Sequence, residues 1–306
     1  MNSFQRFHNR INGDPVDRPP NFDIMMTFAA HYINQPLSRY YLDYNILCEA
    51  NLAVQEDFNL DIVQAISDPY REAHDFGLQV EFPDDGLPLS KIPLIQEPDD
   101  LKKLTAPDPY TGKRMSDRLE ANRHIREQVG GEVPIMGWVE GALAEAADLR
   151  GDTKILIDLY DRSEWMRDLL EIIVEVEIDF ARAQIEAGAD IIGLGDAIAS
   201  QVSPKMYAEF ALPYEQRIFK AIHDAGGLAR LHICGDTSGI VPLMVDSGAD
   251  IIDLDWMVNI KSAADTFGDY PVICGNFDPV QVMLQGTSDE VYQATQYCLL
   301  NGGPRL

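Results

Sequence analysis

One pattern recurs in the second half of the chain and limits the folds open to it. A helical stretch ends in a short hinge that contains glycine, and an apolar run with strand character follows, at residues 186–195, 224–234 and 246–255. Glycine directly after a helix adopts the left-handed conformation easily and lets the chain turn back. A repeated order of helix, glycine and buried strand is typical of βα units that build a parallel sheet.

The apolar runs predict eight strands of this kind. They cover residues 20–26, 61–67, 133–139, 190–195, 228–234, 250–255 and 271–274, and an eighth begins at residue 304. Helical patterns separate most of them, so we expect an α/β protein with a (β/α)8 TIM barrel as a single domain over residues 1–306. An open doubly wound sheet is the alternative, but no Gly-x-Gly-x-x-Gly sequence opens a helix after a strand.

Two features predict a distorted barrel. The stretch at 68–112 is rich in proline and acidic residues, so we expect a long insertion after the second strand that forms an excursion or a lid. The sequence runs out at Leu306, just after the eighth apolar run begins, so we expect the eighth strand to be cut short.

The charge of the chain restricts its partners. The sequence has 24 Lys and Arg against 50 Asp and Glu, a formal net charge of −26. This charge repels nucleic-acid phosphates and anionic membrane surfaces, and no basic stretch offsets it. No apolar run approaches the ~20 residues of a membrane span, and the first 18 residues do not resemble a signal peptide. Four cysteines do not make a disulfide framework, so we expect a cytoplasmic protein in which a reactive cysteine is a ligand or a nucleophile.

The expected barrel would place its active site at the carboxyl ends of the strands. Acids, His and Cys gather there: Asp68, Glu140, Asp196, His232, Cys234, Asp253, Asp255 and Cys274. His232 and Cys234 are two residues apart on one strand, so their side chains point to the same side. An imidazole beside a thiolate suits Zn2+, although a buried cysteine next to a hydrogen-bonded histidine is the structural alternative.

A catalytic zinc site needs a third protein ligand. Four residues at strand ends are candidates, and the spacing does not decide between them: Cys274, Glu140, Asp196 and Asp255. Cys274 lies one residue inside its strand end, where packing as a small apolar side chain is the alternative. Cys48 and Cys298 lie in helical patterns and are expected in the core.

Together these motifs resemble the uroporphyrinogen decarboxylase superfamily, and within it the zinc-dependent corrinoid methyltransferases and O-demethylases. The resemblance spans essentially the whole chain. The motifs that carry it are 13–20 (GDPVDRPP), Phe58-x-x-Asp61, Ser67-Asp68, Glu140-Gly141, 146–149 (AADL), Gly193-x-Gly195-Asp196, 232–237 (HICGDT) and Gly275-Asn276-x-Asp278-Pro279.

The resemblance implies a distorted TIM barrel and a function. The family's methyltransferases move a methyl group between a small thiol or a methyl ether or amine and a corrinoid (cobalamin) held on a partner protein, and dimers are common among them. His232 and Cys234 match their zinc-binding His-x-Cys motif. Their third zinc ligand is a cysteine at the end of the eighth strand, for which this sequence has no position.

Further roles are predicted for residues around the expected barrel mouth. A histidine that binds a metal usually donates its other N–H to an acid, so Glu140, Asp196 or Asp255 is expected to orient His232 or the substrate. Asn276, after the seventh strand, and Tyr207 are predicted to contact the cofactor, with core packing as the alternative for Tyr207.

Two other functions remain open. The decarboxylases of the superfamily begin with an arginine-containing segment that binds substrate carboxylates, but residues 21–31 contain no arginine here. The net charge of −26 also disfavours a polycarboxylate substrate, whereas Asp68 resembles the decarboxylase aspartate. The third possibility is a barrel that binds a corrinoid protein without catalysis.

Overall fold

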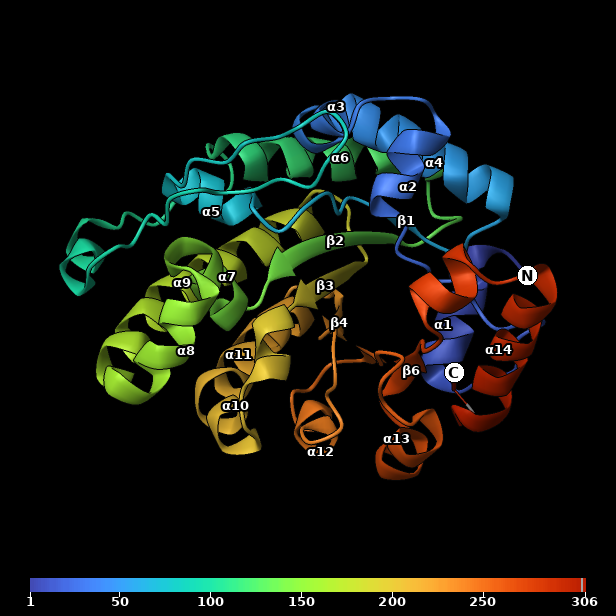
Figure 1. Cartoon of the computed structure of the whole chain (residues 1–306). Coiled ribbons are helices and arrows are strands. Elements are labelled where there is room, and N and C mark those ends of the chain that lie inside the picture. Colours follow the sequence, from blue (N-terminus) through green and yellow to red (C-terminus); the bar gives the residue numbers. More distant parts are fainter. Residues whose placement is uncertain (304) are drawn as a thin grey trace.

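A single parallel sheet forms the centre of the computed structural model, which describes residues 1–303 and 305–306. Its six strands follow one another in chain order (Figure 1). They are β1 (Val63–Gln64), β2 (Ile135–Glu140), β3 (Ile191–Gly195), β4 (Leu228–His232), β5 (Ile251–Asp253) and β6 (Val272–Cys274). The pairing register places Glu140, Gly195, His232, Asp253 and Cys274 in one row across the carboxyl ends of the strands.

Helices surround this sheet in an arc (Figure 1). The α-helices are α1 (Ser3–Asn12), α2 (Met26–Tyr32), α3 (Leu37–Leu42), α4 (Tyr44–Phe58), α5 (Arg71–Phe76), α6 (Lys113–Val129), α7 (Ala142–Arg150), α8 (Asp152–Asp161), α9 (Ser163–Glu186), α10 (Pro204–Phe210), α11 (Leu212–Asp224), α12 (Val241–Val245), α13 (Ile260–Phe267) and α14 (Ser288–Asn301). Shorter helical turns are η1 (Pro98–Lys103), η2 (Ala197–Gln201) and η3 (Pro279–Leu284). Among the described residues, no helix combines the length and apolar character needed to cross a membrane.

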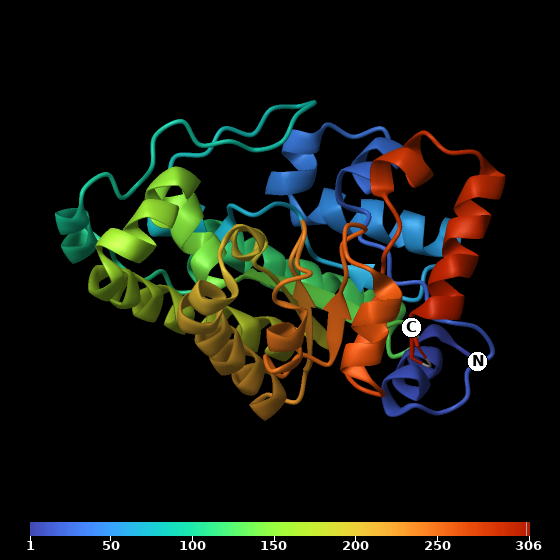
Figure 2. The same cartoon turned by 60° about the horizontal axis from the view of Figure 1, so that its bottom comes forward.

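The strands divide their side chains between two apolar clusters, because successive residues point to opposite faces. Val139, Leu194 and Leu231 belong to the large core shared with α7, α9 and α11. Met136 and Trp138, on the other face, pack against residues of α1 and the loop after it. Helix α1 therefore packs against this face of the sheet. Both chain ends lie beside it (Figure 2), and the Arg305 side chain donates to the Ile11 carbonyl at 3.1 Å.

The prediction of a parallel α/β protein is confirmed, but the described residues form six strands and not the eight of a closed barrel. Residues 20–26, predicted as the first strand, run without ladder pairing into α2. The physical reason is that side chains take the backbone acceptors of this segment: Arg230 donates to the Phe22 carbonyl at 3.2 Å and Gln64 donates to the Asp23 carbonyl. The predicted eighth strand begins at Pro304, outside the described residues, and Arg305 and Leu306 are not in a strand.

The predicted excursion at 68–112 contains α5, η1 and long irregular segments. Its outer part is attached to the helices beside it, since Arg150 of α7 donates to the Gln96 carbonyl at 3.0 Å. The Trp165 indole of α9 donates to the Pro98 carbonyl, also at 3.0 Å. Both views show this segment running along the outside of the molecule (Figures 1 and 2). A role as a lid stays a prediction.

Candidate active site

His232 and Cys234 lie at the carboxyl end of β4, and their side chains meet there. Gly235 follows with φ +98, a left-handed conformation that turns the backbone away from the pair. Cys234 is exposed, and the His232 side chain is 36% exposed. The imidazole and the thiol lie close enough for each to shift the pKa of the other. The pair predicted from the i, i+2 spacing is therefore brought together at the surface of the sheet edge.

The next strand holds the imidazole in place. His232 Nδ1–H donates to Asp253 Oδ2 at 2.8 Å, and Arg230 Nε donates to Asp253 Oδ1 at 2.8 Å. Arg230 and Asp253 are both buried on the inner side of the sheet. Because Nδ1 is occupied by the carboxylate, Nε2 is the nitrogen that remains for Cys234 or a metal ion.

The same contacts set the proton affinities of the pair. Burial lowers the pKa of His232, but the hydrogen bonds with Asp253 and Cys234 outweigh burial and raise this pKa to about 9. The hydrogen bond from His232 lowers the pKa of the Cys234 thiol. A thiol that ionises easily next to an oriented imidazole is a suitable pair of ligands for a borderline metal ion.

Asp253 is the orienting acid that the sequence argument missed. Asp255 was predicted for this role together with Glu140 and Asp196, because strand β5 was expected to reach residue 255. The strand ends at Asp253, which puts Asp253 directly opposite His232 in the register. Asp255 instead accepts from the backbone N–H groups of Gly235 at 2.9 Å and Met257 at 3.0 Å, so it fixes the loops around the pair.

Glu140 reaches the same region from β2. In the row it is separated from His232 by Gly195 alone, and a Cβ atom at Gly195 would lie 3.1 Å from Glu140 Oε2. The Trp138 ring packs over the same glycine and contacts the His232 ring edge-on, with centroids 5.9 Å apart. The absence of a side chain at Gly195 therefore leaves the space into which the Glu140 carboxyl projects.

Of the remaining predicted residues, Asp196 and Tyr207 lie deeper and Asn276 is partly exposed. Asp196 is fully buried with its carboxyl against Gly141 at the start of α7, and burial raises its pKa to about 7. Tyr207 is also fully buried, and its hydroxyl donates to Glu215 at 2.6 Å. Asn276 donates to the carbonyls of Asp255 and Val258 at 3.0 and 2.7 Å. In this conformation Tyr207 has no exposed surface for a cofactor, and the Asn276 amide is engaged by the backbone.

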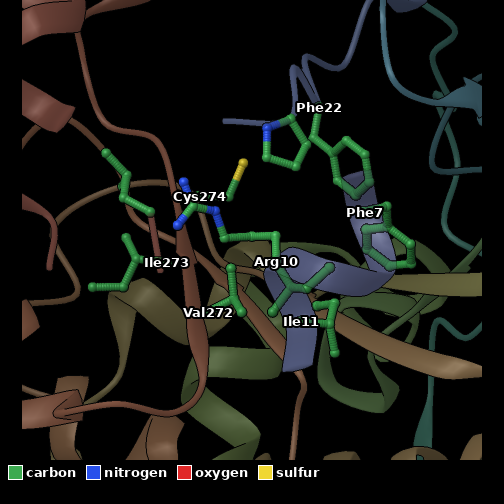
Figure 3. Close-up of a pocket in the computed structure, with 10 residues that line it drawn as sticks. Phe7, Arg10, Ile11, Phe22, Val272, Ile273 and Cys274 are labelled. Carbon is green, nitrogen blue, oxygen red and sulfur yellow. The ribbon is translucent and has the colours of Figure 1, made fainter. Parts of the chain in front are cut away.

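Cys274 lies at the other end of the row and faces a different environment. Its sulfur accepts from Arg230 Nη2 at 3.5 Å, and burial raises its pKa to about 12. It also lines a small, mainly apolar pocket between α1, the loop after α1 and β6 (Figure 3). These surroundings favour a neutral, packed thiol over a metal-binding thiolate.

The donor chemistry of His232 and Cys234 fits Zn2+, and the Asp253 hydrogen bond is the usual support for a zinc-bound histidine. In the part of the chain that the structure describes, no three His, Cys, Asp or Glu side chains converge closely enough to hold a metal ion together. The described residues thus offer two candidate ligands, whereas a catalytic zinc site needs three.

Comparison with known proteins identifies the family. The profile of uroporphyrinogen decarboxylase (URO-D) matches residues 2–305. The chain belongs to the URO-D family. The family predicted from the motifs is therefore confirmed.

Relatives within this family carry two different names. A methylcobamide:CoM methyltransferase MtbA of Methanosarcina acetivorans is 28% identical over 302 residues, which cover 96% of this chain and 88% of that protein. MtbA of Methanosarcina mazei is 31% identical over 67% of this chain and 60% of its own length. A uroporphyrinogen decarboxylase of Thioalkalivibrio sulfidiphilus is 29% identical over 84% of this chain and 74% of its own length.

A solved structure shares the whole fold. A methyltransferase from Methanosarcina mazei superposes with a TM-score of 0.91 over 99% of this chain and 91% of its own length, at 23% identity. This similarity establishes the fold that the URO-D family profile implies.

Proposed function

We propose that this chain is a zinc-dependent methyltransferase that moves a methyl group between a small thiol or a methyl ether or amine and a corrinoid carrier. The observation that carries the proposal is the His232–Cys234 pair, oriented by Asp253 at the carboxyl end of the sheet. The names of the MtbA relatives point to the same chemistry.

Each residue of the site has a function in this proposal. Asp253 keeps the Nδ1 proton of His232 in place, so that the Nε2 lone pair faces outward together with the Cys234 sulfur. These two side chains would hold the zinc ion, which when bound activates a substrate sulfur or oxygen as a Lewis acid. Asp255 and Asn276 fix the loops that carry Gly235 and Val258 beside the pair.

The proposal also includes the partners. The relatives' name points to a corrinoid, which we expect on a separate carrier protein, and the small substrate is expected to enter at the exposed Cys234. A cytoplasmic location and a homodimer remain parts of the proposal. A third zinc ligand is required in addition to His232 and Cys234.

The test is corrinoid methylation by the zinc-loaded chain, followed by the visible absorbance change from Co(I) to methyl-Co(III). A panel of methyl thioethers, ethers and amines serves as donors, and coenzyme M serves as acceptor in the reverse direction. We expect turnover with at least one of these substrates and its loss in His232→Ala and Cys234→Ala. Unchanged turnover in both variants would contradict the proposal.

The decarboxylase alternative makes a different prediction, namely CO2 release from uroporphyrinogen by metal-free protein. The surroundings of Asp68 oppose it. The Asp68 carboxyl is buried, accepts from Arg114 Nη2 at 2.5 Å and from the Ser67 hydroxyl at 2.6 Å, and is therefore occupied by the protein itself.

A further inference from the structure

Five carboxyl groups lie together behind the Glu140 side of the site. They come from α5 (Glu72), β2 (Glu140), α7 (Glu145 and Asp148) and α9 (Glu177). The side chains of Glu72, Glu145 and Glu177 have no exposed surface, and Glu140 is 7% exposed. Within the described residues, the only cation that makes an ion pair with any of them is Arg71.

Contacts connect three of these groups, namely Glu140, Glu72 and Glu177. Arg71 Nη2 donates to Glu140 Oε1 at 2.9 Å, and Arg71 Nε lies 3.4 Å from Glu72 Oε2. The Glu72 and Glu177 carboxyls are close enough to share a hydrogen bond. No donor of the described residues reaches any carboxyl oxygen of Glu145 or Glu177. Two carboxyl groups share a hydrogen bond when one of them carries a proton, so this arrangement needs bound protons.

The charge count leads to the same conclusion. One arginine neutralises one carboxylate, and further negative charges without partners are costly in a site closed to water. Burial and the neighbouring acids raise the pKa of Glu145 and of Glu177 well above the usual range. A metal ion is not the alternative, because no three of these groups converge on one point in the described part of the chain.

The two ends of this cluster of five carboxyl groups face different surroundings. Asp148 is partly exposed and lies near Asp152 and Tyr70 at the surface. Glu140 projects its Oε2 over Gly195, one position from His232 in the row. Asp68 and Arg114 lie nearby and form an ion pair with each other. The five carboxyl groups therefore occupy the region between the surface at Asp148 and the proposed site of methyl transfer.

We propose that Glu140 donates a proton to the heteroatom that a methyl group leaves, and that the buried carboxyl groups of Glu72, Glu145 and Glu177 hold the protons from which Glu140 is refilled. This inference rests on the proposed function and narrows its substrate class to methyl donors whose leaving group needs a proton, such as methyl ethers. The bond between carbon and oxygen breaks with its electron pair on oxygen, and the Co(I) electron pair forms the new cobalt–carbon bond. The O–H bond of Glu140 breaks as the product O–H bond forms, and the carboxylate left behind is paired with Arg71.

The first test uses ring-substituted methyl phenyl ethers, whose phenol leaving groups differ in acidity, with zinc-loaded protein and a Co(I) corrinoid. A general acid matters most for the poorest leaving group, and its removal costs about 10²–10⁴-fold in rate. We expect Glu140→Gln to lose about 10²–10⁴-fold in rate with the ether of the least acidic phenol, and to lose little with the ether of a nitrophenol. Glu127→Gln, an exposed acid on α6, is the matched control.

A uniform loss across the series would overturn the inference, because it would show that Glu140 only positions the substrate. An unchanged rate in Glu140→Gln would overturn it too. Methylation of coenzyme M without turnover of any ether would leave the proposed function standing and exclude Glu140 as the donor to an ether oxygen.

The second test does not depend on activity. Infrared difference spectra in H2O and D2O at neutral pH report protonated carboxyl groups through their C=O stretch. We expect such bands in the native protein and in Glu127→Gln, and weaker bands in the Glu145→Gln/Glu177→Gln double variant, where Glu140 still carries its proton. Absence of the bands in the native protein would overturn the inference. Absence of turnover with every substrate, with the bands present, would contradict the proposed function instead.

Discussion

Asp253 accepts hydrogen bonds from two side chains of the neighbouring strand, His232 and Arg230. The first bond fixes the orientation of the imidazole, and the second compensates the buried charge of Asp253. The orientation of the metal-binding pair thus depends on a residue that does not contact the metal in our proposal.

Replacement of this residue gives the first prediction. We expect Asp253→Asn to lower zinc affinity by about 10–100-fold, because the amide no longer accepts strongly from Nδ1–H. Competition with a chromophoric chelator measures the affinity, and far-UV circular dichroism checks the fold. Asp265→Asn, an exposed acid on α13, is the control. Equal affinities in the two variants would show that Asp253 does not support the metal.

A second residue-scale prediction concerns Gly193. A Cβ atom at this position would overlap the six-membered ring of Trp138, which is buried between β2 and β3. We expect Gly193→Ala to destabilise the protein by about 1–3 kcal/mol, as overpacking of a core usually does. Urea unfolding measures the change. Gly131→Ala, at an exposed position with open space, should have little effect, and a similar effect of both substitutions would rule out the overlap.

At the scale of elements, α5, α7 and α9 bring Glu72, Glu145 and Glu177 together without a matching number of cations. Their pKa values in the folded state are raised. The folded protein therefore binds more protons here than the unfolded chain. The stabilisation from these protons is complete below the unfolded pKa of about 4.3 and is lost as the pH rises toward the folded values.

Glu177→Gln should therefore reduce the loss of stability with rising pH. One group contributes a slope of up to about 1.4 kcal/mol per pH unit above the unfolded pKa. Urea unfolding at several pH values between about 5 and 8 measures the slope, with Glu127→Gln as control. Parallel stability curves for the native protein and Glu177→Gln would contradict raised proton binding at this position.

The sequence predicted the elements unequally. Strands β3 to β5 were predicted because each is a buried apolar run after a glycine hinge, and β2 was predicted from its apolar run alone. The segment at 20–26 was predicted as a strand for the same apolar character. Its backbone bonds with Gln64 and Arg230 depend on residues far away in the chain, which no local pattern contains.

The residues of the candidate site were also predicted only where the information was local in the sequence. His232 and Cys234 were predicted from their spacing on one strand, which is local information. Asp253 was assigned no role, because its contact with His232 depends on where β5 ends and on the register between β4 and β5. The cluster of carboxyl groups behind Glu140 was missed entirely, since its members are scattered over β2 and three helices.

At the scale of the whole molecule, the parallel sheet collects the carboxyl ends of its strands into one row, and this row contains Glu140, His232 and Asp253. The chain carries a net charge of −26. Its fold is shared with a Methanosarcina methyltransferase. The URO-D family contains relatives named for two different reactions.

Zinc binding by the purified chain tests this account most directly. Dialysis against limiting Zn2+ followed by metal analysis should give a single zinc ion per chain in the native protein. The ion should be lost from His232→Ala and Cys234→Ala, and retained in Cys274→Ala, since Cys274 packs as a neutral thiol beside Arg230. Zinc retained in full by the His232 and Cys234 variants would contradict the central claim that these two residues form the metal centre.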